Sequence, residues 1–162
     1  MTVRESRIDL TVRALAPDDW EVLRELRYAA LTDAPHAFGS TLARERTFTE
    51  DVWRQFTTHM AVALLAEEPV GLVGCVVIDG DAELVSMWVA PEARRIGTGR
   101  ALVDWARGHA AELGFKEITL WVADGNDDAA RFYEECGFVP SGRRAPFLRD
   151  PTAFRMQMTR RV

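Results

Sequence analysis

The sequence predicts a single α/β domain, and three observations lead to that prediction. The chain has 162 residues, which is the size of one domain and enough to bury a core. Segments with apolar residues at helical spacing alternate with segments of strand-like apolar pattern, so helices and strands are mixed along the chain. No internal repeat, low-complexity tract or linker divides the sequence. One domain over residues 1–162, with mixed strand connections, is therefore expected.

The N-terminal third is expected to hold one strand and two helices. Residues 8–12 alternate apolar and polar side chains, which is typical of a half-buried strand. A helix begins near Pro17, where two acidic residues follow at the positive end of the helix dipole. Its apolar residues continue at helical spacing as far as a loop over residues 33–40. A short helix is then expected over residues 49–56, with Thr49 as its N-cap.

The middle of the chain predicts three consecutive strands joined by tight turns. Residues 60–66 and 70–78 are apolar runs rich in β-branched side chains, and residues 67–69 between them are expected to form a turn. A second turn at residues 79–81 contains the dipeptide Asp-Gly and leads into a third strand over residues 82–90.

A loop rich in glycine and arginine follows these strands, and a helix follows the loop. Gly114 ends that helix, because glycine readily adopts the left-handed conformation found after a helix C-terminus. In order, the expected elements of this half are a helix over residues 99–113, a strand over 115–123, a helix over 126–136, and strands over 137–143 and 153–159.

The composition excludes several classes of protein. The longest apolar runs are far too short to span a bilayer, and the N-terminal residues contain no apolar segment of the kind found in secretory signals. The two cysteines, Cys75 and Cys136, cannot build a disulfide framework and form no metal-type pair. We therefore expect a cytoplasmic protein with no membrane partner and no metal site.

Charge is unevenly distributed along the chain. The formal net charge is −5, which argues against sequence-independent binding of nucleic acid, because such binding needs many cations to neutralise phosphates. Residues 1–93 carry 16 acidic and 8 basic side chains, whereas residues 94–162 carry 9 acidic and 12 basic ones. Only Lys116 among the basic residues is a lysine, and arginine suits bidentate contacts to phosphate or carboxylate. No nucleic-acid partner is expected.

The segment between residues 90 and 102 has the pattern of a phosphate-binding loop. A strand ends at Ala90, a loop with two glycines and three arginines follows, and a helix begins near Gly99. Backbone N–H groups at a helix N-terminus hold phosphate, and glycines let the backbone approach it. Dinucleotide-binding and Walker patterns both fit poorly, because the third glycine position is Leu102 and the required lysine is absent. Turn-forming glycines and solvated arginines are the simpler alternative for this loop.

Two motifs stand out in the second half of the chain. Arg94, Gly97 and Gly99 form an R-x-x-G-x-G loop, and residues 126–138 match the pattern N-x-x-A-x-x-F-Y-x-x-x-G-F at every position. Together they resemble the pyrophosphate loop and the helix-to-strand signature of the GNAT superfamily of N-acetyltransferases. With the order of elements, the resemblance covers residues 5–160. It implies the GNAT fold, a mixed and twisted β-sheet flanked by helices in a single α/β domain.

The resemblance implies that acetyl-CoA is the co-substrate, that an amine is the acceptor and that no metal takes part. Backbone groups at the end of the fourth strand would hold the pantetheine arm, the Met87 amide would reach the thioester carbonyl, and the loop would wrap the diphosphate. Arg95 stands where the family often has glycine, which leaves its backbone conformation open. The implied cofactor-binding residues are Met87, Trp88, Val89, Arg94, Arg95, Ile96, Gly97, Thr98, Gly99, Arg100 and Asn126.

Transfer to an amine needs a base, because an alkylammonium with a pKa of about 10.4 must first lose a proton. Glu83 is a candidate, since the base glutamate of histone-type relatives stands at the same six-residue spacing before the position of Val89. Strand alternation would put Glu83 on one face with Val85, Met87 and Val89. A solvated acid after a turn explains Glu83 equally well. The other candidates for the base are Asp33, Glu45 and backbone carbonyls with water.

Departure of the CoA thiolate needs a proton donor, since a thiol of this kind has a pKa of about 8.5. The resemblance implies that Tyr133 faces the sulfur and supplies that proton. An aromatic side chain that only packs in the core is the alternative for this residue. Trp20 and Trp53 lie on helices that cover the acceptor site in relatives, so both are candidates to line an acceptor pocket.

The sequence therefore predicts an acyltransferase that moves acetyl from acetyl-CoA directly to an amine of a small molecule or peptide. Two alternatives stay open, namely a non-catalytic acyl-CoA-binding or regulatory module and a transferase that uses a longer acyl-CoA. The negative charge of residues 1–93, which build most of the acceptor side in the family, favours a cationic acceptor over an acidic one. A homodimer also stays open.

Overall fold

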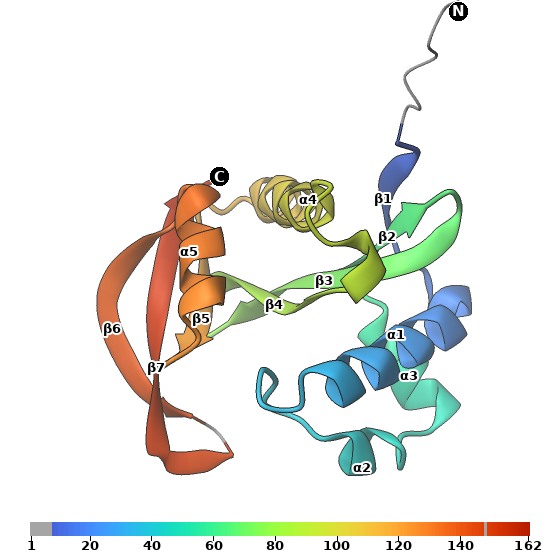
Figure 1. Ribbon diagram of the computed structural model, residues 1–162, viewed down its shortest axis with the longest axis horizontal. Helices are drawn as coiled ribbons and strands as arrows, with labels where there is room; N and C mark the ends of the chain where they lie inside the picture. Colours follow the sequence, from blue (N-terminus) through green and yellow to red (C-terminus); the bar gives the residue numbers. More distant parts are fainter. Residues whose placement is uncertain (1–7, 148) are drawn as a thin grey trace, which may run out of the picture.

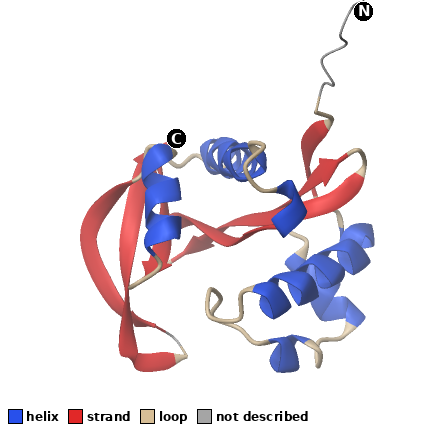
Figure 2. Cartoon of the chain, viewed as in Figure 1, coloured by secondary structure: helices blue, strands red, loops and turns tan. Residues whose placement is uncertain are grey.

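A seven-stranded sheet forms the centre of the protein (Figures 1 and 2). The computed structural model describes residues 8–147 and 149–162, so residues 1–7 and 148 of the predicted domain lie outside the described residues. The strand order is β1-β2-β3-β4-β5-β7-β6, and every neighbouring pair is antiparallel except β4 with β5, which is parallel. This arrangement confirms the predicted mixed sheet. The strands are β1 (Leu10–Ala14), β2 (Met60–Leu65), β3 (Glu68–Ile78), β4 (Asp81–Val89), β5 (Glu117–Ala123), β6 (Val139–Phe147) and β7 (Asp150–Arg161).

Helices cover both faces of the sheet. Helices α1, α2 and α3 lie on one face and α4 lies on the other, with α5 beside α4 (Figure 1). None of the described helices has the length and apolar character needed to cross a membrane. The helices are α1 (Trp20–Asp33), α2 (Leu42–Glu45), α3 (Glu50–Phe56), α4 (Thr98–Glu112) and α5 (Asp127–Glu135), with short 3-10 turns at Pro17–Asp19 and Pro91–Ala93.

The N-terminal elements follow the predicted pattern with small shifts. β1 begins at Leu10 rather than at residue 8, and the 3-10 turn at Pro17 precedes α1. Thr49 is the N-cap of α3, and its hydroxyl accepts a hydrogen bond from Val52 N at 3.4 Å, as predicted. Helix α2 was not predicted, because four residues are too few to show a helical period.

The turn between β2 and β3 differs from the prediction. Ala66 and Glu67 form it, with left-handed φ angles of 48° and 68°, so Pro69 lies inside β3 rather than in the turn. Two consecutive residues with positive φ match the right-handed twist of the flanking strands, which explains why a two-residue turn is enough. The turn before β4 has the same form, with φ angles of 51° at Asp79 and 88° at Gly80.

The last two strands are longer than predicted. β6 begins after the start of the expected range 137–143 and continues past its end, and β7 extends beyond the expected range 153–159 at both ends. Pro146 and Pro151, expected between or at the edges of elements, lie within these strands. Pro140 and Pro146 lie within β6, which is one of the two edge strands of the sheet. An edge strand tolerates proline, since its outer side needs no backbone donor.

The core lies between the sheet and the helices on both of its faces. Fully buried side chains come from each layer, and both cysteines are buried and free. Burial raises the pKa of the Cys75 thiol to about 11, so this thiol stays protonated and unreactive at neutral pH. Representative fully buried residues are Leu23 of α1, Trp53 of α3, Leu72 of β3, Leu102 of α4 and Ile118 of β5.

Candidate active site

The candidate site lies where β4 and β5 separate. The two strands pair only through Ala82 with Ile118 and Glu83 with Thr119. β4 then continues to Val89 without a further β5 partner among the described residues. The β5-facing backbone groups of this part of β4 are therefore left without a neighbouring strand, and such groups pair readily with an extended ligand.

A β-bulge at Ser86 changes the direction of the β4 side chains. The register with β3 shifts at this point, so that Ser86 and Met87 together lie opposite one β3 residue. Ser86 adopts a left-handed φ of 56°. A bulge adds one residue to a strand and thereby reverses the alternation of side chains beyond it.

Residues before and after the bulge line two separate cavities. Glu83 and Val85 line one of about 340 Å³, which we call the strand cavity, and Met87 and Val89 line another of about 420 Å³, which we call the loop cavity. The prediction that these four side chains share one face is therefore wrong, because the bulge lies between the two pairs. Among the described residues, Tyr133 is the one that lines both cavities.

The loop cavity brings together most residues predicted to hold the cofactor. It is bounded by the end of β4, the loop before α4, and α5. Ile96, Gly97, Thr98 and Arg100 belong to the same loop and helix start but do not line the cavity itself. The predicted residues that line it are Met87, Trp88, Val89, Arg94, Arg95, Gly99 and Asn126.

The loop before α4 presents backbone groups to open space. Arg95 and Gly97 have left-handed φ angles of 63° and 92°, which settles the conformation that the sequence left open at Arg95. A Cβ at Gly97 would meet no other atom within 4 Å. Gly97 O accepts the first helical hydrogen bond from Ala101 N at 3.0 Å, so the N–H groups of the first turn of α4 have no helical acceptor. Such a helix start suits an anionic group.

Arg94 is held by other residues of the protein. Its guanidinium donates to Asp33 Oδ2 at 2.7 Å and to Val89 O at 3.0 Å. Asp33 Oδ2 also accepts from Trp88 Nε1 at 3.0 Å, and the bonds from Trp88 and Arg94 lower the pKa of the Asp33 carboxyl. Asp33 is therefore a poor proton acceptor, and the Arg94 side chain connects α1 to the loop.

Gly99 and Thr98 serve the packing of α4. A Cβ at Gly99 would lie 2.9 Å from the ring of Phe132, so glycine here allows α5 to pack against α4 rather than a ligand to approach. The Thr98 side chain is buried and donates to Ala93 O at 2.8 Å. Asn126 is the N-cap of α5, and its side-chain oxygen accepts from Ala129 N at 3.3 Å.

Tyr133 occupies the boundary between the two cavities. Its side chain is 8% exposed, and burial raises the pKa of the phenol, so the hydroxyl keeps its proton at neutral pH. Its ring packs at 71° against Phe138, with the centroids 5.8 Å apart. No side-chain hydrogen bond of the described residues involves this hydroxyl, which leaves it available to a ligand.

Glu83 lies on the strand cavity in a half-buried position. Burial is the main influence on its pKa and raises it, while the positive charge of Arg155 and a hydrogen bond from Trp121 act in the opposite direction. A carboxylate with a raised pKa is a better proton acceptor than an ordinary one. The environment of Glu83 therefore suits a general base better than that of Asp33.

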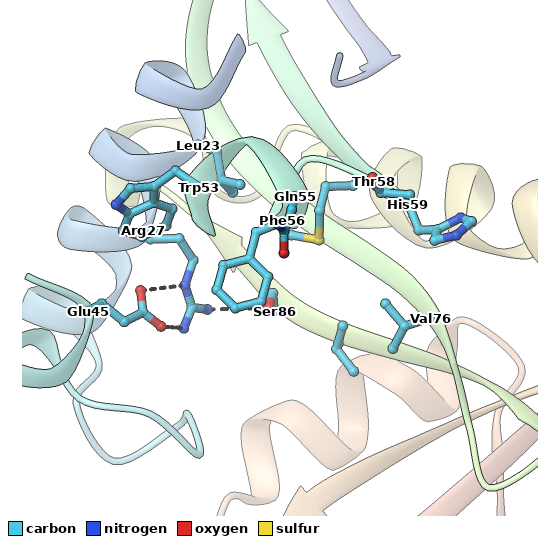
Figure 3. Close-up of a pocket in the computed structure, with 12 residues that line it drawn as sticks. Leu23, Arg27, Glu45, Trp53, Gln55, Phe56, Thr58, His59, Val76 and Ser86 are labelled. Carbon is cyan, nitrogen blue, oxygen red and sulfur yellow. Dashed lines mark hydrogen bonds and ion pairs between the residues drawn. The ribbon is translucent and has the colours of Figure 1, made fainter. Parts of the chain in front are cut away.

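Arg27, which lines the strand cavity, forms a buried ion pair with Glu45. Arg27 Nε donates to Glu45 at 3.1 Å, a second bond joins the same two side chains, and Arg27 also donates to Ser86 Oγ at 3.3 Å (Figure 3). Both carboxylate oxygens of Glu45 are thus occupied. Glu45, an alternative base in the sequence, instead orients an arginine that reaches the bulge of β4.

Replacing Glu45 with glutamine is expected to lower the free energy of unfolding by about 3 kcal/mol, because Arg27 would stay buried without its counter-charge. The side chains of Arg27 and Glu45 are 10% and 5% exposed. Asp104→Asn is the control, since its pair with Arg107 is at the surface and is worth less than about 1 kcal/mol. Urea denaturation measures both variants, and equal losses would contradict the structural role of the buried pair.

A third cavity of about 360 Å³ adjoins the strand cavity and is mainly apolar. The two share Arg27, Val85 and Ser86 as a common wall. Trp53 lines this apolar cavity but not the strand cavity, so its place at an acceptor pocket stays a prediction (Figure 3). Trp20 lines none of the cavities described here and instead contacts the guanidinium groups of Arg24 and Arg54.

Comparison with known proteins identifies the family and the fold of this chain. The model of the acetyltransferase (GNAT) family matches residues 20–138. The chain belongs to the GNAT acetyltransferase family. It is 33% identical over 111 residues to the peptidyl-lysine N-acetyltransferase YjaB of Escherichia coli, a match that covers 68% of this chain and 70% of that protein. The expectation of an N-acetyltransferase is thereby confirmed.

Solved structures have the same fold as this GNAT chain. Ard1 from Thermoplasma volcanium has a TM-score of 0.73 at 23% identity, covering 96% of this chain and 99% of that one. The yncA protein of Salmonella typhimurium, solved with acetyl-CoA, has a TM-score of 0.74 at 18% identity and covers 94% of each chain. A spermidine/spermine N-acetyltransferase of Vibrio cholerae has a TM-score of 0.66 at 26% identity, covering 94% and 92%.

Three residues of the site were not predicted. Ser86 forms the bulge, and nothing in the apolar pattern of β4 indicates a bulge at that point. Arg155 lies on β7 and reaches the strand cavity only through the pairing of β5 with β7. Arg27 could have been found from the sequence, because it stands four residues after Leu23 on the buried face of α1. A charged residue at such a position requires a partner.

Proposed function

We propose that this GNAT protein transfers acetyl from acetyl-CoA directly to a primary amine, with Glu83 as general base and Tyr133 as general acid. The observation that carries this proposal is the position of Tyr133 on both cavities, with Glu83 on one of them. Proton removal and proton donation can then occur on opposite sides of one reacting carbon.

The loop cavity has the properties required for the CoA part of the substrate. The open space at Gly97 and the first N–H groups of α4 suit the diphosphate, and Arg95 adds a cation beside it. The unpaired edge of β4 near Met87 suits the amide groups of pantetheine, which would extend the sheet as a strand does. The Met87 amide is then our candidate for the bond to the thioester carbonyl.

The strand cavity has the properties required for the acceptor. Glu83 would take a proton from the ammonium, and the free amine would attack the thioester carbon. The C–S bond breaks as the new C–N bond forms, and the Tyr133 hydroxyl would give its proton to the departing sulfur. The proton that the acetylated nitrogen loses as the neutral amide forms would return to the Tyr133 oxygen and restore the phenol. Burial raises the pKa of Tyr133, so the phenol still carries its proton when the thiolate leaves.

The acceptor is an amine, and its class is open between small molecules and peptides. The relative from Escherichia coli is named for peptidyl-lysine, and the structural neighbour from Vibrio cholerae for spermidine and spermine. A panel of primary amines incubated with acetyl-CoA, followed by CoA release and mass spectrometry, tests the proposal. Acetylated product is expected. Tight binding of CoA without turnover of any amine would favour a non-catalytic module. Faster turnover with a longer acyl-CoA than with acetyl-CoA would indicate that the longer acyl-CoA is the donor.

Gly97→Val is expected to weaken CoA binding by about tenfold or more, because a branched side chain would fill the space beside the first turn of α4. Valine at positive φ also strains the backbone by about 1–3 kcal/mol. Gly114→Val is the matched control, since Gly114 has φ of 89° and open space at the other end of α4. Calorimetry should find weaker CoA binding in Gly97→Val only. If both variants bound CoA with equal affinity, the loop would not be part of the CoA site.

A further inference from the structure

Arg155 is a charged side chain of the strand cavity that has no counter-charge in contact with it. Three charged residues line this cavity, namely Arg27, Glu83 and Arg155. Arg27 is neutralised by Glu45. The ion pairs within 4.0 Å among the described residues do not include Arg155, and its Nε is buried without a hydrogen-bond partner. A buried donor without a partner calls for an explanation, because such groups are rare in folded proteins.

The position of Arg155 is set by the sheet. Arg155 pairs with Ala123 in the β5–β7 ladder, and its guanidinium lies 4.4 Å from the ring centroid of Trp121. Stacking on the ring face holds the guanidinium plane while its N–H groups stay at the edge of the plane, free to donate. A planar fork of donors fits the two oxygens of a carboxylate.

Ser40 supplies a second unsatisfied donor in the same cavity. Its hydroxyl is buried and has no hydrogen-bond partner. Ser40 belongs to the segment between α1 and α2, and its backbone oxygen accepts a bond from Arg149 at 2.9 Å, which ties this segment to the β6–β7 connection. Arg155 and Ser40 therefore present donors to one cavity from separate parts of the chain.

We propose that the acceptor carries a carboxylate close to the amine that is acetylated, and that Arg155, assisted by Ser40, binds this carboxylate. The proposal rests on the proposed function and names the acceptor class, that of amino acids and similar small zwitterions. Glu83 faces the ammonium of such a molecule and Arg155 faces its carboxylate, so each charge of the ligand meets the opposite charge. A peptidyl lysine has no carboxylate beside its amine and would leave Arg155 without a partner.

Matched acceptor pairs test this inference. The kcat/KM of CoA release, corrected for the fraction of free amine, is measured for leucine and phenylalanine and for their amides. The amides replace the carboxylate with a neutral group, and their amine is also less basic. The wild type is expected to prefer the acids. Arg155→Gln should lower kcat/KM for the acids by about 10- to 100-fold, the loss expected for one charge-assisted hydrogen bond, and lower it for the amides by much less. Because the positive charge of Arg155 also lowers the pKa of Glu83, both acceptors are compared at a pH where Glu83 is ionised in the variant. Ser40→Ala should give a smaller loss in the same direction.

Arg161→Gln is the control, because Arg161 lies on the same strand but is exposed and lines none of the cavities. CoA affinity, measured by calorimetry, verifies that each variant folds. Equal losses on acids and amides in Arg155→Gln, or a wild-type preference for amides or lysine peptides, would overturn the inference while the proposed transferase activity stands. If the wild type released CoA with none of the amines tested, the proposed function itself would be refuted, and the inference with it.

Discussion

Tyr133→Phe is expected to lower kcat by about 10²- to 10⁴-fold while CoA affinity and thermal stability change little. The variant keeps the ring that packs against Phe138 and removes only the hydroxyl. Proton donation to the leaving sulfur acts in the transition state, so its loss appears in turnover rather than in ground-state binding. Stopped-flow or steady-state assays of CoA release measure the effect.

The chain offers a matched control for this change. It has two tyrosines, and the other, Tyr28, packs edge-on against Trp53 with ring centroids 5.9 Å apart. Tyr28→Phe removes the same atom at a site that lines none of the cavities described here, so kcat should stay near the wild-type value. If Tyr133 had only a packing role, Tyr133→Phe would give the opposite outcome, namely a lower melting temperature or weaker CoA binding with kcat unchanged.

The motifs could be predicted because each is local in sequence. The loop that begins at Arg94 and the capped helix that begins at Asn126 lie within short segments, and the two cavities meet beside them. Their residue types alone do not reveal what each residue does. Gly97 and Gly99 belong to one motif, yet a Cβ at Gly97 meets open space and a Cβ at Gly99 meets Phe132. The second contact depends on how α4 and α5 pack.

The acceptor side could not be predicted in the same way because it is assembled from distant segments. Arg27 and Glu45 are 18 residues apart, and Arg155 comes to the cavity of Glu83 through the order of strands. The bulge at Ser86 has the largest consequence, since it separates Glu83 from Met87, which simple alternation had put on one face.

The net charge of the N-terminal segment and the charges on the wall of the strand cavity differ. The acidic excess of residues 1–93 favoured a cationic acceptor, yet Glu83 is the one acidic residue that lines the strand cavity, beside Arg27 and Arg155. Surface acids contribute little to a site beyond a Debye length of about 8–10 Å. The cationic acceptor stays a prediction, which the comparison of amino acids with their amides tests.

Glu83→Gln is expected to lower kcat at neutral pH by about 10²- to 10⁴-fold for an alkylamine acceptor. The base must be ionised to act, so the wild-type rate should rise with pH as Glu83 loses its proton. Burial raises the pKa of Glu83, which moves this rise above the ordinary glutamate range. In the variant, the increase of kcat with pH that is due to Glu83 disappears. The difference in kcat between variant and wild type should shrink as the pH approaches the amine pKa of about 10.4, because free amine is then present in solution without a base.

Stability separates this role from a structural one. When the pKa of a carboxyl is higher in the folded than in the unfolded protein, the folded state binds the proton more tightly. Such a carboxyl destabilises the folded protein once the pH rises above the pKa that the carboxyl has in the unfolded protein. Glu83→Gln should therefore be as stable as the wild type or more stable at pH 7, with the difference vanishing in acid where Glu83 is protonated. Glu117→Gln, a change of the same kind at an exposed β5 position, should alter neither rate nor stability. If Glu83→Gln kept a wild-type pH–rate profile, the base would have to be water held by backbone carbonyls, since Asp33 and Glu45 are both engaged by arginine.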